Sequence, residues 1–166
     1  YWSPKMSIDK NLDEKVASAE INRLLQKSVN LRMRSDVPIA FCLSGGIDSS
    51  LLASLASKKL NRKISTFSII DKEPNYNEIE NINLVVKDLK CKNAKIFLKN
   101  KKKFFFDRLK KLTSYHDGPI STISYYIHSF LSEEISKKGY KVAISGTGAD
   151  EIFTGYYDHY LLHLQS

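Results

Sequence analysis

The chain has 166 residues, of which 42% are apolar and 27% are charged, and its net charge at pH 7 is +8. This balance fits one globular domain and excludes wholesale disorder, a collagen-like repeat and a disulfide-rich scaffold. No apolar run approaches the roughly 18 residues of a membrane span, and two widely spaced cysteines favour a reducing, cytoplasmic compartment. Because only five of the 26 basic residues are arginine, the charge indicates a lysine-rich solvated surface rather than nucleic-acid recognition.

Helical and strand patterns alternate along the chain. Apolar residues recur with a helical period from Leu12 to Met33, which predicts a long amphipathic helix capped by Asn11 or Asp9. A short apolar run without alternation follows and suits a strand buried on both faces. The elements expected after the first helix are a strand at 39–43, a helix at 47–60, a strand at 64–70, a helix at 77–89, a strand at 95–98, a helix at 101–114, a helix at 124–137, a strand at 141–145 and an apolar aromatic tail. This alternation predicts an α/β fold, a doubly wound parallel sheet with helices on both faces.

The strongest chemical signal is the segment Leu43–Ser50, Leu-Ser-Gly-Gly-Ile-Asp-Ser-Ser, which follows a strand and opens a helix. Ligands of open parallel sheets bind outside the carboxyl ends of the strands, and a helix N-terminus there attracts anions. The two glycines let the backbone approach a phosphate, whereas Asp48 would repel one unless Mg²⁺ lay between them. The segment is neither a Walker A loop nor a dinucleotide fingerprint. The alternative is a plain strand–turn–helix connection.

A second constellation follows the last predicted strand. Residues 145–148 form a glycine turn, and Asp150 and Glu151 stand at an expected helix start. Two strand ends that each deliver an aspartate, Asp48 and Asp150, could hold one or two Mg²⁺ ions against a triphosphate. The alternative is an acidic first turn that complements the helix dipole.

These motifs resemble those of a known family. Leu43–Ser50 resembles the pyrophosphate-binding loop of the N-type ATP pyrophosphatases, the PP-loop superfamily. Ser145–Tyr156 is similar to the second signature of its glutamine-hydrolysing asparagine synthetases. Shorter stretches that also resemble this branch are Tyr1-Trp2, Leu31–Pro38, Phe67–Ile69 and Tyr76–Glu78. The resemblance covers nearly the whole chain and implies the adenine nucleotide alpha-hydrolase-like form of the α/β fold.

The resemblance implies a carbon–nitrogen ligase of amino-acid biosynthesis that works in two steps. ATP activates a side-chain carboxylate, aspartate in asparagine biosynthesis, as an acyl-adenylate and releases pyrophosphate. Ammonia from glutamine then displaces AMP. The implied cofactors are ATP and Mg²⁺. The implied partners are the carboxylate substrate, ammonia, a glutaminase domain in the full-length chain and, as an option, a second copy in a homodimer, with neither a membrane nor a nucleic acid among them.

The resemblance also implies which residues form the site, by their positions in the matching motifs. Ser44, Gly45, Gly46, Ser49 and Ser50 would cradle the pyrophosphate portion of ATP. Leu43, Ile69, Ser145 and Gly146 would line the adenosine site. Asp48 and Asp150 would bind Mg²⁺, and together with Glu151 they are the expected catalytic residues.

The chain departs from the family pattern at Thr147, where many members carry an acidic residue. Threonine cannot act as a base near neutral pH, so Glu78, Asp117 or Glu151 would replace it, or the substrate is not aspartate. The family's glutaminase domain begins with a catalytic cysteine and its later helical region supplies a lysine. Neither is found here, so we expect residues 1–166 to be the ATP-pyrophosphatase domain alone, a fragment of a longer chain.

Three alternatives stay open. The same loop occurs in adenylating enzymes that modify tRNA. The net positive charge alone favours this alternative, whereas the second motif with Gly155-Tyr156 and the Tyr1-Trp2 segment disfavour it. Related chains also amidate sugar or secondary-metabolite carboxylates. The third alternative is a nucleotide-binding module that has lost catalysis, for which Thr147 is the support.

Overall fold

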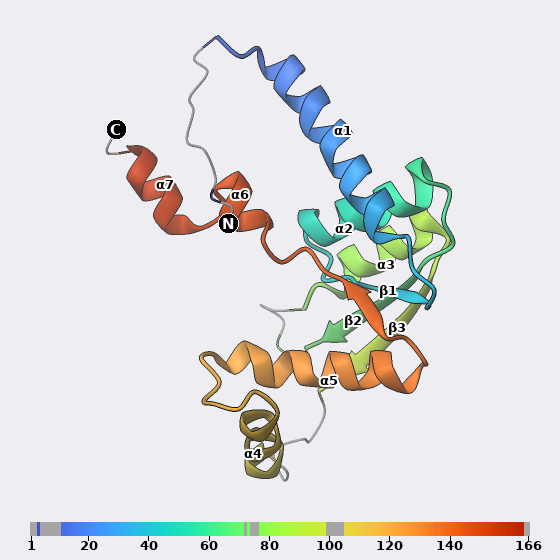
Figure 1. Cartoon of the computed structure of the whole chain (residues 1–166), viewed down its shortest axis with the longest axis vertical. Coiled ribbons are helices and arrows are strands. Elements are labelled where there is room, and N and C mark those ends of the chain that lie inside the picture. Colours follow the sequence, from blue (N-terminus) through green and yellow to red (C-terminus); the bar gives the residue numbers. More distant parts are fainter. Residues whose placement is uncertain (1–2, 4–10, 72, 74–76, 99–104, 165–166) are drawn as a thin grey trace.

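The computed structural model describes residues 3, 11–71, 73, 77–98 and 105–164. Within these ranges the strands are β1 (Ile39–Cys42), β2 (Ser65–Ile70), β3 (Lys92–Phe97) and β4 (Val142–Ile144). They form one parallel sheet in the order β3-β2-β1-β4 (Figure 1). The expected cap Asp9, the start of the helix expected at 101–114, and Tyr1, Trp2 and Tyr76 of the resembling stretches lie outside the described residues.

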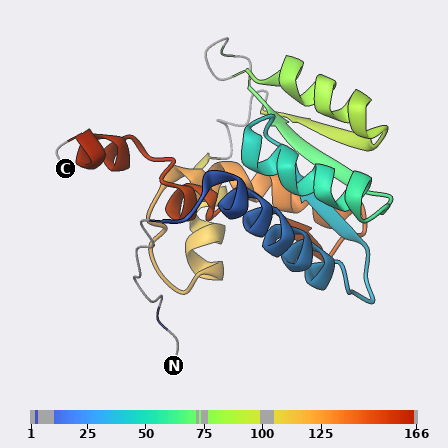
Figure 2. The ribbon, with the colours of Figure 1, turned by 90° about the horizontal axis from the view of Figure 1, so that it is seen from above.

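Helices cover both faces of this sheet (Figures 1 and 2). On one face lie α1 (Glu14–Arg32), α2 (Ile47–Ser54) with its π-helical continuation η1 (Leu55–Lys59), and α3 (Ile79–Leu89). On the other face lies α5 (Ile123–Lys137), with α4 (Phe105–Tyr115) packed beside it. Beyond β4 the chain forms α6 (Ala149–Phe153) and α7 (Tyr157–Leu164), and α7 projects away from the body in both views. The doubly wound parallel α/β fold predicted from the sequence is therefore confirmed.

The central strand β1 is buried on both faces, as its apolar run predicts. Phe41 and Ala40 are neighbours on β1 that point to opposite faces, yet 1% and 0% of their surfaces are exposed. Phe41 packs under α1, α2 and α3 with Val29, Ala53, Leu55, Ala56, Ile64 and Leu89. Ala40 packs toward α5 with Phe67, Ile96, Tyr126, Phe130 and Ile135. Burial on two sides fixes the position at which β1 ends and its loop begins.

The first helix begins two residues later than its apolar pattern predicts. Its cap is Asp13, whose carboxylate accepts hydrogen bonds from the backbone N–H of Lys15 (2.8 Å) and Val16 (3.3 Å). Asn11, one of the two caps predicted from the sequence, lies outside the helix, so that prediction is wrong. Only Val29 of α1 is buried, whereas Leu12 and Val16 are 53% and 59% exposed. The helix thus packs on the sheet layer through its C-terminal part.

Strand β3 begins three residues earlier than the expected strand 95–98. The polar residues at its start are typical of a loop, but they pair with β2 in register, beginning with Lys92 opposite Ser65. The Asn93 side-chain amide donates to the hydroxyls of Thr66 (3.0 Å) and Ser68 (2.9 Å), both of which are 1% exposed. These hydrogen bonds pair the Asn93 amide N–H groups and the two buried hydroxyls within the sheet, although the Asn93 side-chain oxygen has no partner among the described residues.

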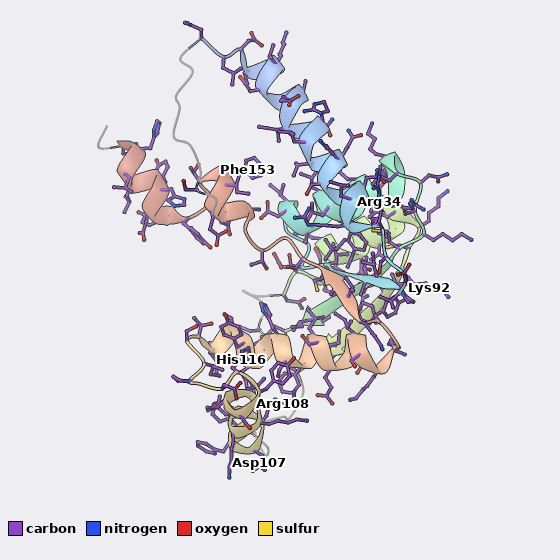
Figure 3. All side chains as sticks on the ribbon, in the orientation of Figure 1. Arg34, Lys92, Asp107, Arg108, His116 and Phe153 are labelled. Carbon is purple, nitrogen blue, oxygen red and sulfur yellow. The ribbon has the colours of Figure 1, made fainter. Side chains whose placement is uncertain are left out.

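On the opposite face, α4 and α5 are joined by charge as well as by apolar packing. Figure 3 shows Arg108 on α4 beneath α5. Its guanidinium donates to Ser129 and Glu133 and lies 3.9 Å from the ring centroid of Phe130. Hydrogen bonds from Lys137 and Arg108 lower the pKa of Glu133 to about 2. Gly139, at φ +84°, follows α5 as the sequence predicts. None of the helices among the described residues is both long and apolar enough for a membrane span.

Candidate functional site

The loops after β1 and β4 lie side by side at the carboxyl edge of the sheet. β1 pairs with β2 on one side and with β4 on the other, with Phe41 opposite Ile144. The chain leaves β1 through α2 on one face and reaches β4 through α5 on the other, so the winding reverses between these two strands (Figure 1). Such a reversal is where ligands of open parallel sheets bind. The two glycine motifs of the sequence meet at this point.

The loop after β1 is organised by a pair of serines. The Ser49 hydroxyl accepts from the Ser44 backbone N–H (3.2 Å), lies 3.0 Å from the Ser44 hydroxyl and donates to the Gly46 carbonyl (3.3 Å). The Ser44 hydroxyl in turn accepts from the Gly46 N–H (3.2 Å). Ser49 is buried and Ser44 is exposed. The buried hydroxyl therefore fixes the loop from beneath, while Ser44 faces outward.

Gly45 adopts φ +93°, a conformation that favours glycine. A Cβ at this position would lie 3.1 Å from Asn81 Cβ, 3.2 Å from the Glu78 carbonyl oxygen and 3.2 Å from Ile82 Cγ1. The first turn of α3 therefore packs directly on the loop. A side chain at position 45 would be both strained and crowded.

The N-terminus of α2 is open to a ligand. Gly46 is its N-cap residue, and no described side chain caps the helix. The N–H groups of Ile47, Asp48 and Ser49 have no partner within the helix because they belong to its first turn. The Ser50 hydroxyl oxygen is buried and has no hydrogen-bond partner among the described residues. Unpaired donors and the positive end of the dipole together suit an anion such as a phosphate.

The loop after β4 touches this helix start. A Cβ at Gly146 would lie 3.0 Å from both Asp48 Cβ and the Ser49 backbone nitrogen, so a side chain here would have to push the start of α2 away by a few tenths of an ångström. The Ser145 hydroxyl donates to the Thr147 hydroxyl (3.0 Å). Ser145, Gly146 and Asp48 are thereby brought into one neighbourhood.

The two acidic residues of α6 are held by the residues that follow the helix. The Asp150 carboxylate lies against Gly155, and the Tyr156 hydroxyl donates to a Glu151 carboxylate oxygen at 2.7 Å. This bond lowers the pKa of Glu151 and raises the pKa of Tyr156 from their ordinary values. Asp150 and Glu151 are exposed, whereas Asp48 is half-buried.

Two residues expected on the adenosine side are separated by the sheet. Leu43 is 2% exposed and packs with Ile70 and Ile82 on the α3 side, and its N–H donates to the Phe67 carbonyl (2.8 Å). Ile69 alternates with Ile70 and so belongs to the opposite face. Of the two, Leu43 can offer a ligand only its main chain.

The donor set fits Mg²⁺ bound together with a nucleotide. Among the described residues no group of three or more histidine, cysteine, aspartate or glutamate side chains could hold a metal ion. Mg²⁺ in nucleotide sites is held by one or two carboxylates and by phosphate oxygens, rather than by a complete protein cage. Asp48 beside the open helix N-terminus, with Asp150 after the adjoining strand, meets that requirement.

A separate hollow of about 1350 Å³ lies between α4 and α5. Arg108 and His116 line it, and His116 is flanked by the rings of Tyr115 and Tyr125 (Figure 3). None of the site residues predicted from the sequence lines this hollow.

The fold and the two loops define a parallel α/β domain of the PP-loop type. Residues 20–166 match the family model described as asparagine synthase. The chain belongs to the asparagine synthase family.

Curated relatives agree with this assignment, and a solved structure shares the fold. The chain is 34% identical to asparagine synthetase [glutamine-hydrolyzing] 1 of Bacillus subtilis over 82% of its length, and 34% identical to a putative asparagine synthetase 2 of Methanocaldococcus jannaschii over 89%. These matches cover 21% and 28% of the two relatives, so the chain spans about a quarter of their length. The NH3-dependent NAD synthetase of Campylobacter jejuni shares the fold with a TM-score of 0.50 at 19% identity, over 87% of this chain and 61% of that one.

Sequence reasoning missed two features of the site. It did not place the start of α3 against Gly45, although the demand for glycine comes partly from Asn81 and Ile82. Nor does the signature Ser145–Tyr156 by itself predict that Gly155 contacts Asp150 and that Tyr156 bonds to Glu151. The five-residue spacing from Asp150 to Gly155 and from Glu151 to Tyr156 was the available signal.

Proposed function

We propose that the chain is the ATP-pyrophosphatase domain of an enzyme that amidates a carboxylate through an acyl-adenylate. One observation carries this proposal: the uncapped N-terminus of α2 opens beside the loop of the adjoining strand β4, with an aspartate on its first turn. The asparagine synthase family match and the glutamine-hydrolysing relatives support the reaction class. The preferred substrate is aspartate.

The residues of the first loop bind the leaving group. In our proposal the N–H groups of residues 47–49 and the hydroxyls of Ser44 and Ser50 bind the pyrophosphate portion of ATP, while Ser49 keeps the loop in shape. Attack at the α-phosphate leaves negative charge on pyrophosphate, and aligned N–H donors that need no reorganisation stabilise that charge. Gly45 and Gly46 keep the loop free of side chains at the approach.

The residues of the second loop act from the other side. Asp48 and Asp150 would hold Mg²⁺, which neutralises phosphate charge when it is bound. Ser145, Gly146, Ile69 and the main chain of Leu43 would form the adenosine side, where the close contact of Gly146 with α2 brings the two motifs together. Glu151, held by Tyr156, is the acidic group we assign to the chemistry of the substrate.

Thr147 bears on the substrate rather than on the nucleotide. It is exposed and bonded to Ser145, and its hydroxyl cannot serve as a base near neutral pH. Glu151 lies four residues further on and is ionised at neutral pH. We therefore propose that Glu151 takes the role that an acidic residue at position 147 would fill.

The remaining parts of the reaction are proposed from the relatives. The relatives are glutamine-hydrolysing enzymes, and this supports ammonia from a glutaminase domain as the nitrogen donor. Cys42 and Cys91 are free thiols, which supports a reducing compartment such as the cytoplasm.

The test is a product analysis on the complete polypeptide that carries this chain, incubated with Mg·ATP, aspartate and ammonia or glutamine. We expect AMP, pyrophosphate and asparagine, all dependent on aspartate, and we expect Asp48→Ala to abolish AMP formation. AMP that forms only with another carboxylate would keep the adenylation and move the substrate. AMP formation that depends on tRNA, or no AMP with any acceptor, would overturn the proposal.

A further inference from the structure

The acidic pair of α6 sits in a part of the molecule with little packing around it. No residue of α6 is buried, and Ile152 and Phe153 are 73% and 46% exposed. Figure 3 shows Phe153 on this helix, outside the layers formed by the sheet and its covering helices. The apolar core therefore does not fix the two carboxylates, and their orientation depends on local contacts.

Those contacts come from two consecutive residues. Thr154, at φ +57°, ends α6, and the Gly155 N–H donates to the Asp150 carbonyl at 2.9 Å. This turn folds residues 155 and 156 back over the two acidic residues. Gly155 then faces Asp150, and Tyr156 faces Glu151.

At Gly155 the carboxylate occupies the space of a side chain. A Cβ there would lie 1.9 Å from Asp150 Oδ1, 2.8 Å from its Cγ and 3.1 Å from its Cα. The carboxylate oxygen is the end of a rotatable side chain and can move aside. The 3.1 Å separation between the added Cβ and the Asp150 Cα is short, but a shift of a few tenths of an ångström relieves it. An alanine at 155 would thus turn the Asp150 carboxylate away without demanding a new backbone.

At Tyr156 the contact is a hydrogen bond near the surface. The 2.7 Å bond to Glu151 joins two exposed groups, and such a bond contributes little to the stability of the fold. What it does is select one orientation of the Glu151 side chain out of several. The Tyr156 ring also lies near that of His159, at 5.3 Å between centroids.

We propose that Gly155 and Tyr156 are positioning residues of the site: Gly155 sets the Asp150 carboxylate, and Tyr156 sets the Glu151 carboxylate. The inference rests on the proposed function, which gives those two carboxylates different tasks. It follows that neighbouring substitutions have different effects. A change at 155 alters the response to Mg²⁺, and a change at 156 alters turnover.

The experiment has a ligand-free arm and a functional arm. In the first, the chain labelled with ¹³C at the tyrosine Cζ atoms is examined by NMR as wild type and as Glu151→Gln. We expect the Tyr156 resonance to move and that of Tyr157, whose ring contacts Tyr160, to stay. An unmoved Tyr156 resonance would overturn the inference, whatever the chain binds.

In the second arm, Mg²⁺ is titrated at fixed ATP, and turnover is measured in the complete polypeptide. We expect Gly155→Ala to raise the half-saturating Mg²⁺ concentration about tenfold without changing ATP binding in EDTA, as losses of partners to metal ligands do. Tyr156→Phe should leave the Mg²⁺ response unchanged and lower kcat about tenfold at constant KM, through misplacement of Glu151. In a Glu151→Gln background, Tyr156→Phe should cause no further loss.

Two matched controls separate positioning from general damage. Gly118→Ala adds a Cβ whose nearest neighbour among the described residues is 3.9 Å away, and Tyr157→Phe alters the exposed tyrosine next in the chain. Both should behave as wild type. If Gly155→Ala does not fold, Tyr156→Phe, which adds no atom, still decides the matter. If the wild type binds Mg·ATP and the two variants equal it in Mg²⁺ response and turnover, this inference alone is overturned. If the wild type does not bind Mg·ATP, the proposed function is overturned.

Discussion

The two loops that meet at the sheet edge are built in different ways. The loop after β1 follows a strand buried on both faces, is tied by the hydroxyl of Ser49 and is covered by the first turn of α3. The segment after β4 follows a three-residue strand at the edge of the described sheet, and its helix has no buried residue. Packing shapes the first loop, whereas a few local contacts shape the second.

The difference matches the tasks we assign. A binding cradle for pyrophosphate must present N–H donors in a fixed array, which a rigid support provides without reorganisation. The acidic segment must deliver two carboxylates to a metal and a substrate, and each carboxylate has one local partner, Gly155 or Tyr156. Three predictions test how far this contrast extends.

The largest expected effect is on core packing beneath the first loop. Leu43→Ala removes a 2%-exposed side chain from the cluster with Ile70 and Ile82, and should lower the free energy of unfolding by about 2–5 kcal/mol. The matched change in the second region, Ile152→Ala, removes a side chain that is 73% exposed and should cost no more than about 0.5 kcal/mol. Urea unfolding of both variants measures the difference. Equal costs would contradict the contrast.

The next effect compares two glycines that share a left-handed backbone. Gly45 and Gly148 have φ +93° and +99°, but of the two only Gly45 is crowded, since no atom of the described residues lies within 4 Å of a Cβ at Gly148. Gly148→Ala should therefore cost about 1–2 kcal/mol of backbone strain alone. Gly45→Ala adds crowding against α3 and should cost about 2–3 kcal/mol. Thermal unfolding of both variants measures the two losses. A larger loss for Gly148→Ala than for Gly45→Ala would contradict this account.

The smallest effect lies outside both loops and serves as a reference. Hydrogen bonds from Lys137 and Arg108 depress the pKa of Glu133 to about 2, so its stabilisation is present above about pH 4.5 and is lost as the pH falls toward 2. Because the side chain is 38% exposed, we expect about 1 kcal/mol at pH 7. Glu133→Gln should remove that amount at pH 7 and nothing once the pH is below 2, in unfolding measured across this range. The loss should add to that of Gly45→Ala, and non-additive losses would couple α5 to the loop.

Much of the fold followed from the sequence because its signals are local. The apolar run of β1, the glycine turn and the helical spacing after it each reflect one element. The first residues of two elements, β3 and α1, could not be predicted from such local signals. β3 begins at polar residues whose partners lie on β2, and α1 is capped by Asp13 although Asn11 and Asp9 are as suitable chemically. Non-local pairing and competition between equal caps carry no local signature.

The site divides in the same manner. The anion-accepting loop could be predicted because a strand, two glycines and a helix start are contiguous in the chain. The contact of Gly146 with Asp48 depends on β4 lying next to β1, which alternation of elements does not determine. The hydrogen bond from Tyr156 to Glu151 requires the left-handed turn at Thr154. A threonine in the sequence does not predict that conformation.

The central claim is that the N-terminus of α2 binds the pyrophosphate portion of ATP. The most direct measurement is the amide ¹H–¹⁵N spectrum of the chain titrated with Mg·ATP and, separately, with Mg·pyrophosphate. We predict that both ligands shift the N–H signals of Gly46, Ile47, Asp48 and Ser49, and that only Mg·ATP also shifts Ser145 and Gly146. Binding that leaves the four helix-start signals unmoved would contradict the claim.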